Sequence, residues 1–359
     1  MRISLRSVSK KLKRLNYICN TLVADYKSRS VLEDQMVLDQ WKGNIDPGPG
    51  RRFCIFASFD PQSRVADYVF HYVSQLCDLG FCIIFVTTSE QVRESDIDRL
   101  RSFCAYIVHR RNVGLDFGSW KIGLTFIPRP MTGKSLLLAN DSVYGPLFDL
   151  RESFARAERE GYDLWGITDN WEVQYHVQSY FVYLNEAFCG SEAFSQFFAG
   201  MKLIDSKIVA INRYEVGLSQ CALRAGFKVG ALCSYTSIIK HALDDANQRL
   251  EKLSQLRVNF NGNIFSILFR KLPDPYMDEF NYYAWIRKKI SKNIPLNQNH
   301  HFWRILIDAY RCPFMKTGLL RNPRANIPGL HEWPHVVDRT DYDTRLITDH
   351  FKRVSPRKA

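Results

Sequence analysis

Residues 53–87, FCIFASFDPQSRVADYVFHYVSQLCDLGFCIIFVT, decide the fold. The apolar run at 53–59 is rich in β-forming residues and ends at Asp60-Pro61, which predicts a buried strand. Apolar residues then recur with a 3.6-residue period up to Gly80, which predicts a helix. A second apolar strand follows at 81–87. A strand, a helix and another strand in this order indicate a parallel sheet with right-handed crossovers.

The same alternation continues along the chain. Ser89 is a good N-cap for a helix that extends to Phe103, and further strands are expected at 105–109, 135–139 and 162–167. We therefore predict an α/β fold with a mostly parallel central sheet flanked by helices. Such sheets bind ligands at the carboxyl ends of their strands.

The positive charge lies at the two ends of the chain. Its 359 residues carry 49 Lys and Arg against 37 Asp and Glu, a formal charge of +12. Residues 1–30 contribute +7 and residues 351–359 contribute +4, which leaves +1 for the body. A nucleic-acid groove usually needs basic residues spread over a folded face, so no nucleic-acid partner is expected.

The N-terminal stretch has helical order. Apolar residues from Leu5 to Tyr26 recur at three- and four-residue intervals, and most basic residues fall off that stripe. The stretch predicts a basic helix that either lies on an anionic membrane surface or packs on its own domain. No segment approaches the roughly 18–20 apolar residues of a membrane span. The nine scattered cysteines lack a CxxC pair and indicate buried reduced thiols, which favours the cytoplasm.

Four polar clusters follow the predicted strands. Residues 110–121 combine two glycines with adjacent cations, which suits either a phosphate site at a helix N-terminus or a tight turn. Asp141, in the cluster 140–146, could hold a metal that bridges two phosphates, or it could cap a turn.

The third and fourth clusters carry candidate catalytic groups. Residues 165–170 lead to a predicted strand at 176–183, where His176, Gln178 and Tyr180 would share one face. Glu215 opens a predicted helix and would serve as a base or only favour the helix dipole.

Taken together, these clusters resemble the rhamnan synthesis protein F family of bacterial polysaccharide glycosyltransferases. The matching blocks occur in order as RNVGLDFGSW, LLLANDSVYGPL, DLWGITDN, HVQSYFVYL and RYEVGLSQ. A further block follows between Asn297 and Pro323, so the resemblance spans roughly residues 53–330.

The resemblance implies transfer of a sugar, often a deoxyhexose such as rhamnose, from a nucleotide-diphosphate donor to a lipid-linked or growing surface polysaccharide. It also implies a GT-A-like nucleotide-binding domain in which Asn140-Asp141-Ser142 stands where the acidic motif meets the donor. This motif has one carboxylate, so a divalent Mg or Mn ion at Asp141 stays open.

An inverting transfer needs a carboxylate to take the acceptor proton and cations to offset the leaving diphosphate. The candidate catalytic residues are Asp169, Glu215 and His176, and the candidate acceptor-binding residues are Gln178 and Tyr180. The candidate donor-binding residues are Asp60, Arg111, Asn112, Gly114, Asp116, Lys121, Asn140, Asp141 and Ser142.

We predict a basic helical extension at 1–50, a GT-A-like core at 51–240, a helical and aromatic subdomain at 241–340 and a basic tail at 341–359. The expected location is the inner face of the cytoplasmic membrane. A non-catalytic scaffold for polysaccharide assembly and a basic nucleic-acid-binding protein are the alternatives. A methyltransferase is disfavoured because no glycine follows the first strand.

The C-terminal region offers one further pattern. Its aromatic residues are Tyr276, Phe280, Tyr282, Tyr283 and Trp285. Aromatic residues at this density favour packing over sugar contact.

Overall fold

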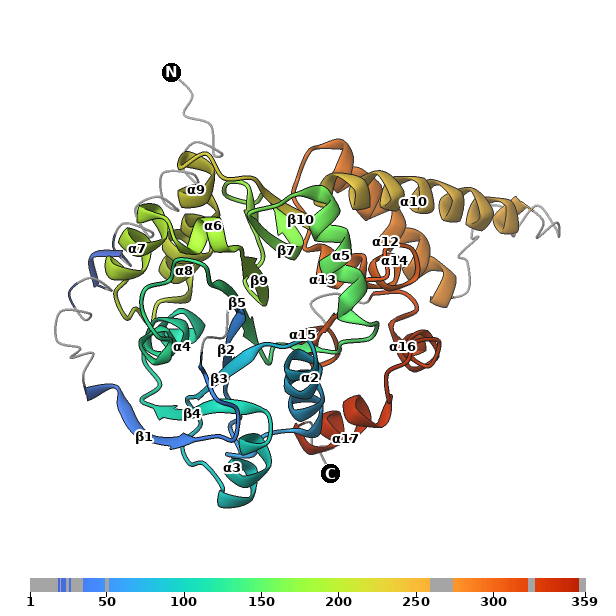
Figure 1. Cartoon of the computed structure of the whole chain (residues 1–359). Coiled ribbons are helices and arrows are strands. Elements are labelled where there is room, and N and C mark those ends of the chain that lie inside the picture. Colours follow the sequence, from blue (N-terminus) through green and yellow to red (C-terminus); the bar gives the residue numbers. More distant parts are fainter. Residues whose placement is uncertain are drawn as a thin grey trace. The chain divides into compact units, whose positions relative to one another are not determined.

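The computed structural model describes residues 19, 21–23, 26, 35–48, 52–258, 274–321 and 327–354 (Figure 1). Most of the predicted N-terminal helix and the tail beyond residue 354 lie outside these residues. The chain forms two compact units. Unit 1 comprises Met1–Asp141, Leu150–Asp169 and Val173–Leu232. Unit 2 comprises Ser142–Asp149, Asn170–Glu172 and Cys233–Ala359.

A nine-stranded mixed sheet organises unit 1, with the order β1-β4-β3-β2-β5-β9-β7-β10 and with β8 paired to β7. The strands are β1 (Val37–Lys42), β2 (Arg52–Ser58), β3 (Cys82–Thr87), β4 (Cys104–Arg110), β5 (Ser135–Asn140), β7 (Leu164–Asn170), β8 (His176–Val177), β9 (Phe181–Leu184) and β10 (Val229–Cys233).

The predicted strands run in one direction. β2 pairs in parallel with β3 and β5, and β3 pairs in parallel with β4. β9 lies antiparallel to both β5 and β7, so β7 keeps the direction of β5. β1 is an antiparallel edge strand. The α/β prediction is therefore confirmed, with β1 and β9 as antiparallel additions.

Helices connect and cover these strands. Those of unit 1 are α2 (Asp67–Asp78), α3 (Glu94–Arg101), α4 (Leu115–Gly123), η2 (Leu124–Phe126), α5 (Leu150–Glu160), α6 (Glu186–Cys189), α7 (Glu192–Ala199), α8 (Lys207–Ala210), the π-helical turn η3 (Ile211–Glu215) and α9 (Val216–Arg224).

Unit 2 is mainly helical. Its helices are α10 (Tyr235–Val258), α12 (Asp274–Ser291), α13 (Gln298–His301), α14 (Trp303–Asp308), α15 (Thr317–Arg321), η4 (Leu330–Glu332), α16 (Trp333–Val337) and α17 (Arg345–Val354). A short antiparallel ladder joins β6 (Val143–Tyr144) to β11 (Met315–Lys316).

Three local predictions are wrong. Ser89 does not cap a helix, because its hydroxyl accepts the amide of Asp60 at 3.0 Å, and α3 begins at Glu94. The predicted strand at 176–183 is broken into β8 and β9, because the amide of Gln178 donates to the carbonyl of Thr168 and the chain then turns. Glu215 does not open a helix, because the helical path begins at Lys207.

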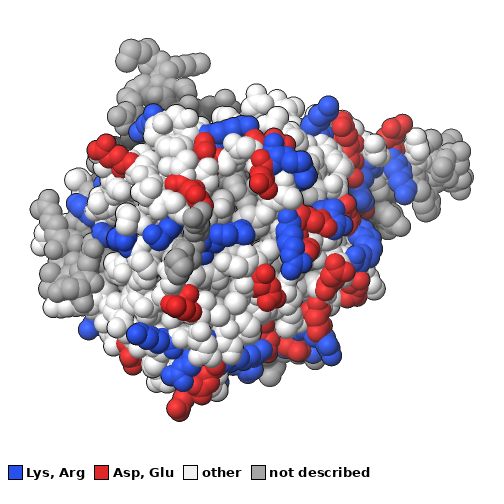
Figure 2. All heavy atoms as spheres, in the orientation of Figure 1, with Lys and Arg blue, Asp and Glu red and all other residues white. Residues whose placement is uncertain are grey.

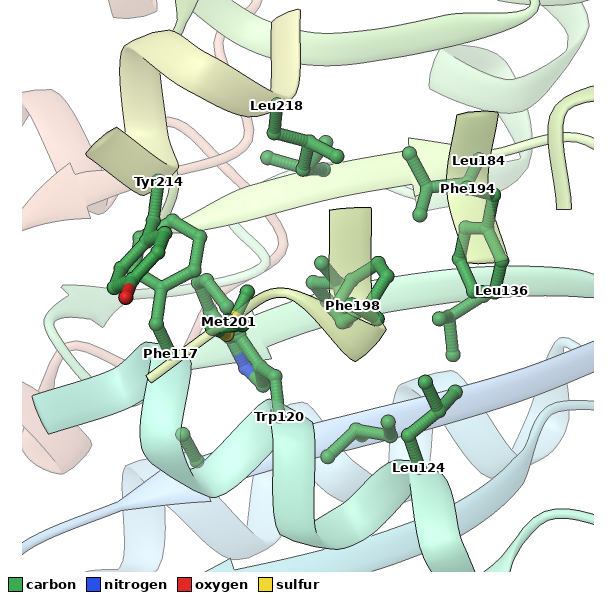
Figure 3. Close-up of a cluster of buried hydrophobic side chains, with 14 of the residues drawn as sticks. Phe117, Trp120, Leu124, Leu136, Leu184, Phe194, Phe198, Met201, Tyr214 and Leu218 are labelled. Atoms are coloured by element: carbon green, nitrogen blue, oxygen red, sulfur yellow. The ribbon is translucent and has the colours of Figure 1, made fainter. Parts of the chain in front are cut away.

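The core of unit 1 packs α4 between the sheet and the helices of residues 186–224. Figure 3 shows Phe117 and Trp120 of α4 and Leu124 of η2 beside Phe198 of α7 and Tyr214 of η3. Trp120 is fully buried, its ring lies 4.7 Å from that of Phe117, and its indole nitrogen donates to the carbonyl of Ala139 at 3.2 Å. This packing fixes the start of α4 against the end of β5.

The cysteines, the helix lengths and the surface charges complete the description of the fold. All nine cysteines are free, and six are buried, as expected for reduced thiols. In the described residues, no helix has the length and apolar character that a membrane crossing requires. Figure 2 shows basic and acidic side chains interspersed over the face it draws.

Candidate functional site

The order of the parallel strands locates the candidate site. The chain proceeds outward from β2 to β3 and β4, and then returns to place β5 on the other side of β2. Ligands of open α/β sheets bind beyond the carboxyl ends of the strands where the strand order reverses. In unit 1 this point lies between Ser58, at the end of β2, and Asn140-Asp141, at the end of β5.

Asp141 is held firmly at this point. Its Oδ2 atom accepts two hydrogen bonds of 2.8 Å, one from the Ser58 hydroxyl and one from the Phe59 amide. Its own amide donates to the carbonyl of Ala57, and the Tyr68 hydroxyl donates to the Asp141 carbonyl. Among the described residues no hydrogen bond reaches Oδ1, so this oxygen is available to a ligand.

The carboxyl of Asp141 titrates near neutrality. Burial raises its pKa to about 7, against the opposing effect of the hydrogen bonds from Phe59 and Ser58. The carboxylates of Asp116 and Asp60 raise the pKa further. A cation or hydroxyl placed beside Oδ1 would favour the ionised form. The ionisation of Asp141 is therefore sensitive to what occupies the site.

Asp60 and Asp116 accompany Asp141. Asp60 is buried and its Oδ1 accepts the amide of Gln62 at 2.8 Å, so it shapes the turn after β2. Asp116 lies in the first turn of α4 and accepts a 2.9 Å hydrogen bond from the Asn140 side chain. Four of the predicted donor-binding residues, these two with Asn140 and Asp141, thus gather at the same edge.

The loop before α4 is built around Arg110, which the sequence analysis did not select. Its guanidinium is fully buried and donates to the Ser119 hydroxyl and to three backbone carbonyls, those of Arg111, Val113 and Leu115. Burial lowers the pKa of Arg110 to about 10, while the carboxylates of Asp116 and Asp205 act in the opposite direction. Arg110 is a structural cation that fixes the loop.

The glycines of this loop serve close packing. Gly114 has a φ of +89°, and a Cβ there would lie 3.1 Å from Leu203. Its amide donates to Asp205 at 2.7 Å. A Cβ on Gly118 would lie 2.6 Å from the carbonyl oxygen of Val113. The glycine-rich block therefore has a structural role beside any role in phosphate binding.

Three other predicted donor-binding residues do not hydrogen-bond to the Asp141 carboxylate in the described part of the chain. Arg111 is exposed and its Nε donates to the carbonyl of Gln35, beside the edge strand β1. The side chain of Lys121 donates to the carbonyl of Met201. Asn112 is exposed.

Ser142, the remaining donor candidate, belongs to unit 2, where its hydroxyl accepts a 3.0 Å hydrogen bond from Lys316.

The predicted catalytic and acceptor residues are linked by the turn at 178–180. The amide of Ser179 donates to Glu215 Oε1 at 2.9 Å, and the carbonyl of Tyr180 accepts the amide of Asn140 at 3.4 Å. The Thr168 hydroxyl contacts both Gln178 and the Tyr180 hydroxyl. This turn therefore connects Glu215 to the end of β5. Glu215 also closes a π-helical turn, a feature frequent at functional sites.

Asp169 and His176 are more deeply placed. Both are buried, and Asp169 is hydrogen-bonded to Tyr175. Burial and the Asp169 carboxylate raise the pKa of Tyr175. The ring nitrogen Nδ1 of His176 lies 2.8 Å from the carbonyl oxygen of Gln174. Because a carbonyl oxygen only accepts hydrogen bonds, Nδ1 carries a proton. In the neutral ring Nε2 is then the basic nitrogen.

The described residues contain no group of three or more His, Cys, Asp and Glu that could hold a metal ion. A divalent ion at Asp141 would therefore take most of its ligands from a bound diphosphate and from water, as Mg²⁺ commonly does.

Sequence reasoning missed Ser58 and Tyr68, which hold Asp141. Ser58 carries a signal in the sequence, as a hydroxyl at the carboxyl end of an apolar strand. Tyr68 carries none, because it falls on the apolar stripe of α2.

One comparison, with a family model, agrees with the resemblance. The model of the family described as rhamnan synthesis protein F matches residues 83–249, which include all five of the ordered blocks. The y4gN protein of Sinorhizobium fredii is 27% identical over 177 residues, which cover 48% of this chain and 46% of that protein. The virulence protein VirA of Vibrio anguillarum is 26% identical over 259 residues, which cover 70% and 73%. The chain thus spans about half the length of y4gN.

Proposed function

We propose that this chain, which matches the rhamnan synthesis protein F family over residues 83–249, is a glycosyltransferase of bacterial polysaccharide synthesis. It would move a hexose or deoxyhexose, such as rhamnose, from a nucleotide-diphosphate donor to a surface glycan. Unit 1 would be its GT-A-like domain. The observation that carries the proposal is Asp141, held through one oxygen at the point where the strand order reverses.

The donor would bind beyond β2 and β5. Asp141 Oδ1 is directed to no other described hydrogen-bond donor, so it can accept a ribose hydroxyl or contact a cation. Asp116 and Asn140, joined at 2.9 Å, would form one wall, and Asp60 would lie near the nucleotide base.

A divalent ion would suit this site if the donor supplies most of its ligands. Asp141 would be its protein ligand. When bound, such an ion offsets the charge of the departing diphosphate. With Arg110 committed to the loop, and Arg111 and Lys121 hydrogen-bonded to backbone carbonyls, this charge needs such a counterion or a movement of these side chains.

Glu215 is the best-placed base for the acceptor hydroxyl. Its Oε1 is fixed by the Ser179 amide, and the partly buried carboxylate lies in a π-helical turn linked to Asn140 through the 178–180 turn. Asp169 and the Nε2 atom of His176 are the other groups able to take a proton. Gln178 and Tyr180 would orient the acceptor. An inverting displacement needs one such carboxylate facing the anomeric carbon.

The acceptor would be a lipid-linked or growing glycan. The basic residues of 1–30 would hold the enzyme at the anionic inner face of the cytoplasmic membrane.

A nucleotide-sugar panel tests the donor site. We expect one nucleotide sugar to raise the thermal unfolding midpoint of the protein, with and without Mg²⁺ or Mn²⁺, because a ligand that binds only the folded state stabilises it. Asp141→Ala should abolish the increase. Asp78→Asn should preserve it, because Asp78 is exposed at the end of α2, before β3 begins.

Stabilisation of both variants to the same extent as the unchanged protein would contradict the role of Asp141. A panel without any binding nucleotide sugar would contradict the proposed donor site.

A further inference from the structure

Unit 2 contains a large cavity that the proposed donor site does not use. Its volume is about 730 Å³, and it is lined by α10, α12, α14 and the segment from Ile327 to Glu332. Small-molecule sites usually measure roughly 300–1,000 Å³. The cavity is therefore large enough for a ligand of several rings.

Aromatic side chains line this cavity. Tyr282 and Tyr283 are only partly buried, and their rings meet edge to face at 5.5 Å. The Tyr282 hydroxyl lies 3.1 Å from Nδ1 of His301. Both tyrosines and His301 line the cavity. The expected packing role is compatible with this position, since the Tyr282 ring lies 6.1 Å from the rings of Trp285 and His301. Such side chains present an apolar face with a polar tip, which suits a sugar ring.

Two arginines add fixed polar groups. Arg249 binds Asp245 at 3.3 Å and Glu279 at 3.2 Å, and its guanidinium lies 5.3 Å from the centre of the Tyr283 ring. Arg304 is held in the same manner by Asp308 and Glu332. Planar guanidinium and carboxylate groups in fixed pairs offer donors and acceptors side by side. Neighbouring hydroxyls of a sugar hydrogen-bond readily to such adjacent donors and acceptors.

The charges of the lining disfavour an anionic ligand. Five carboxylates line the cavity against two arginines, and Arg339, outside the lining, also pairs with one of them, Asp308. Burial and the neighbouring His300 lower the pKa of His301 to about 4, so its ring is neutral at physiological pH. A nucleotide or an acidic glycan would meet net negative charge here. A neutral ligand rich in hydroxyls would not.

We infer that this cavity binds a neutral oligosaccharide through the Tyr282 and Tyr283 rings and the two arginine–carboxylate groups. The inference rests on the proposed function for the role of this ligand, which is the glycan that accepts the sugar. It deepens that function by assigning acceptor recognition to a second site, in addition to Gln178 and Tyr180.

Saturation-transfer NMR and calorimetry on the full chain test this site. The probes are a rhamnose trisaccharide and maltotriose, with a hyaluronan tetrasaccharide and trilysine as anionic and cationic comparisons, each at about 10 mM to detect weak binding. We expect a neutral probe to bind. Tyr282→Ala should weaken its binding about tenfold, the loss expected for one aromatic contact. Phe351→Ala, an exposed aromatic residue of unit 2 outside the cavity, should leave binding unchanged.

Glu279→Gln provides a second variant with nearly unchanged side-chain size. If Tyr282→Ala unfolds the protein, loss of binding in Glu279→Gln supports the site and unchanged binding overturns it. Failure of both neutral probes to bind, or stronger binding of hyaluronan or trilysine, would also overturn it.

Nucleotide-sugar binding is measured separately in the same variants. If a neutral oligosaccharide binds and no nucleotide sugar does, the proposed function is refuted, but the cavity still binds neutral oligosaccharides. Donor binding without sugar binding would refute the cavity alone.

Discussion

The partly exposed residue Asp141, whose carboxyl is largely desolvated, makes the stability of the protein depend on pH. Its pKa rises from 3.8 to about 7 in the folded state, mainly through burial, so the folded state binds this proton more tightly than the unfolded chain. Ionisation therefore costs stability as pH rises from about 4 to about 7. Asp141→Asn removes this cost and retains an oxygen that accepts from Ser58 and Phe59.

As pH rises from about 5 to about 8, the unchanged protein should lose about 3 kcal/mol of unfolding free energy that Asp141→Asn does not lose. Urea unfolding of both proteins at the two pH values measures this difference. Asp78→Asn, which changes an exposed carboxylate, controls for the loss of one charge. Parallel pH dependences for Asp141→Asn and the unchanged protein would refute the account of this carboxyl.

Three further perturbations test the supporting structure. Arg110→Lys should lower the unfolding free energy by about 2–4 kcal/mol, because it leaves buried carbonyls without donors. Arg111→Lys should have little effect. Equal urea midpoints for the two variants would contradict the loop's dependence on Arg110. Gly80→Ala should lower the unfolding free energy by roughly 1–2 kcal/mol, because its φ is positive. Gly114→Ala should lower it further, because Gly114 has a positive φ and also lies against Leu203. Equal losses of unfolding free energy would show that the contact with Leu203 relaxes freely. Deletion of residues 1–30, which carry +7, should weaken co-sedimentation with anionic vesicles and leave donor binding intact; unchanged sedimentation would exclude the anchoring role.

The strands that form the parallel part of the sheet were predictable because each is a buried apolar run. The burial of β3 and β5 along their whole lengths, and of β2 from Phe53 onward, is the physical basis of that signal. β1 was not predictable, since its sequence VLDQWK is largely exposed and its pairing with β4 depends on tertiary context. The break before β9 depends on hydrogen bonds to Thr168 and Glu215, which both lie outside the segment 176–183.

The residues of the candidate site also divide into those that the sequence pattern predicts and those that depend on tertiary contacts. Asp141 was predictable as a carboxylate directly after a buried strand, and its neighbours Asn140 and Asp116 came with the same reasoning. The sequence does not distinguish Arg110 from Arg111, two adjacent cations. The structure does, because β4 places Arg110 inside the loop and Arg111 at the surface.

The central claim is that residues at the ends of β5 and η3 transfer a sugar. Its most direct test is mass spectrometry of a glycan acceptor incubated with the stabilising nucleotide sugar and the full chain. We expect the acceptor to gain the mass of one sugar residue, and both Asp141→Ala and Glu215→Gln to reduce the rate at least about 100-fold, within the range of a lost general base. Transfer at an unchanged rate in both variants, or nucleotide-sugar binding without any transfer to a glycan, would contradict the claim.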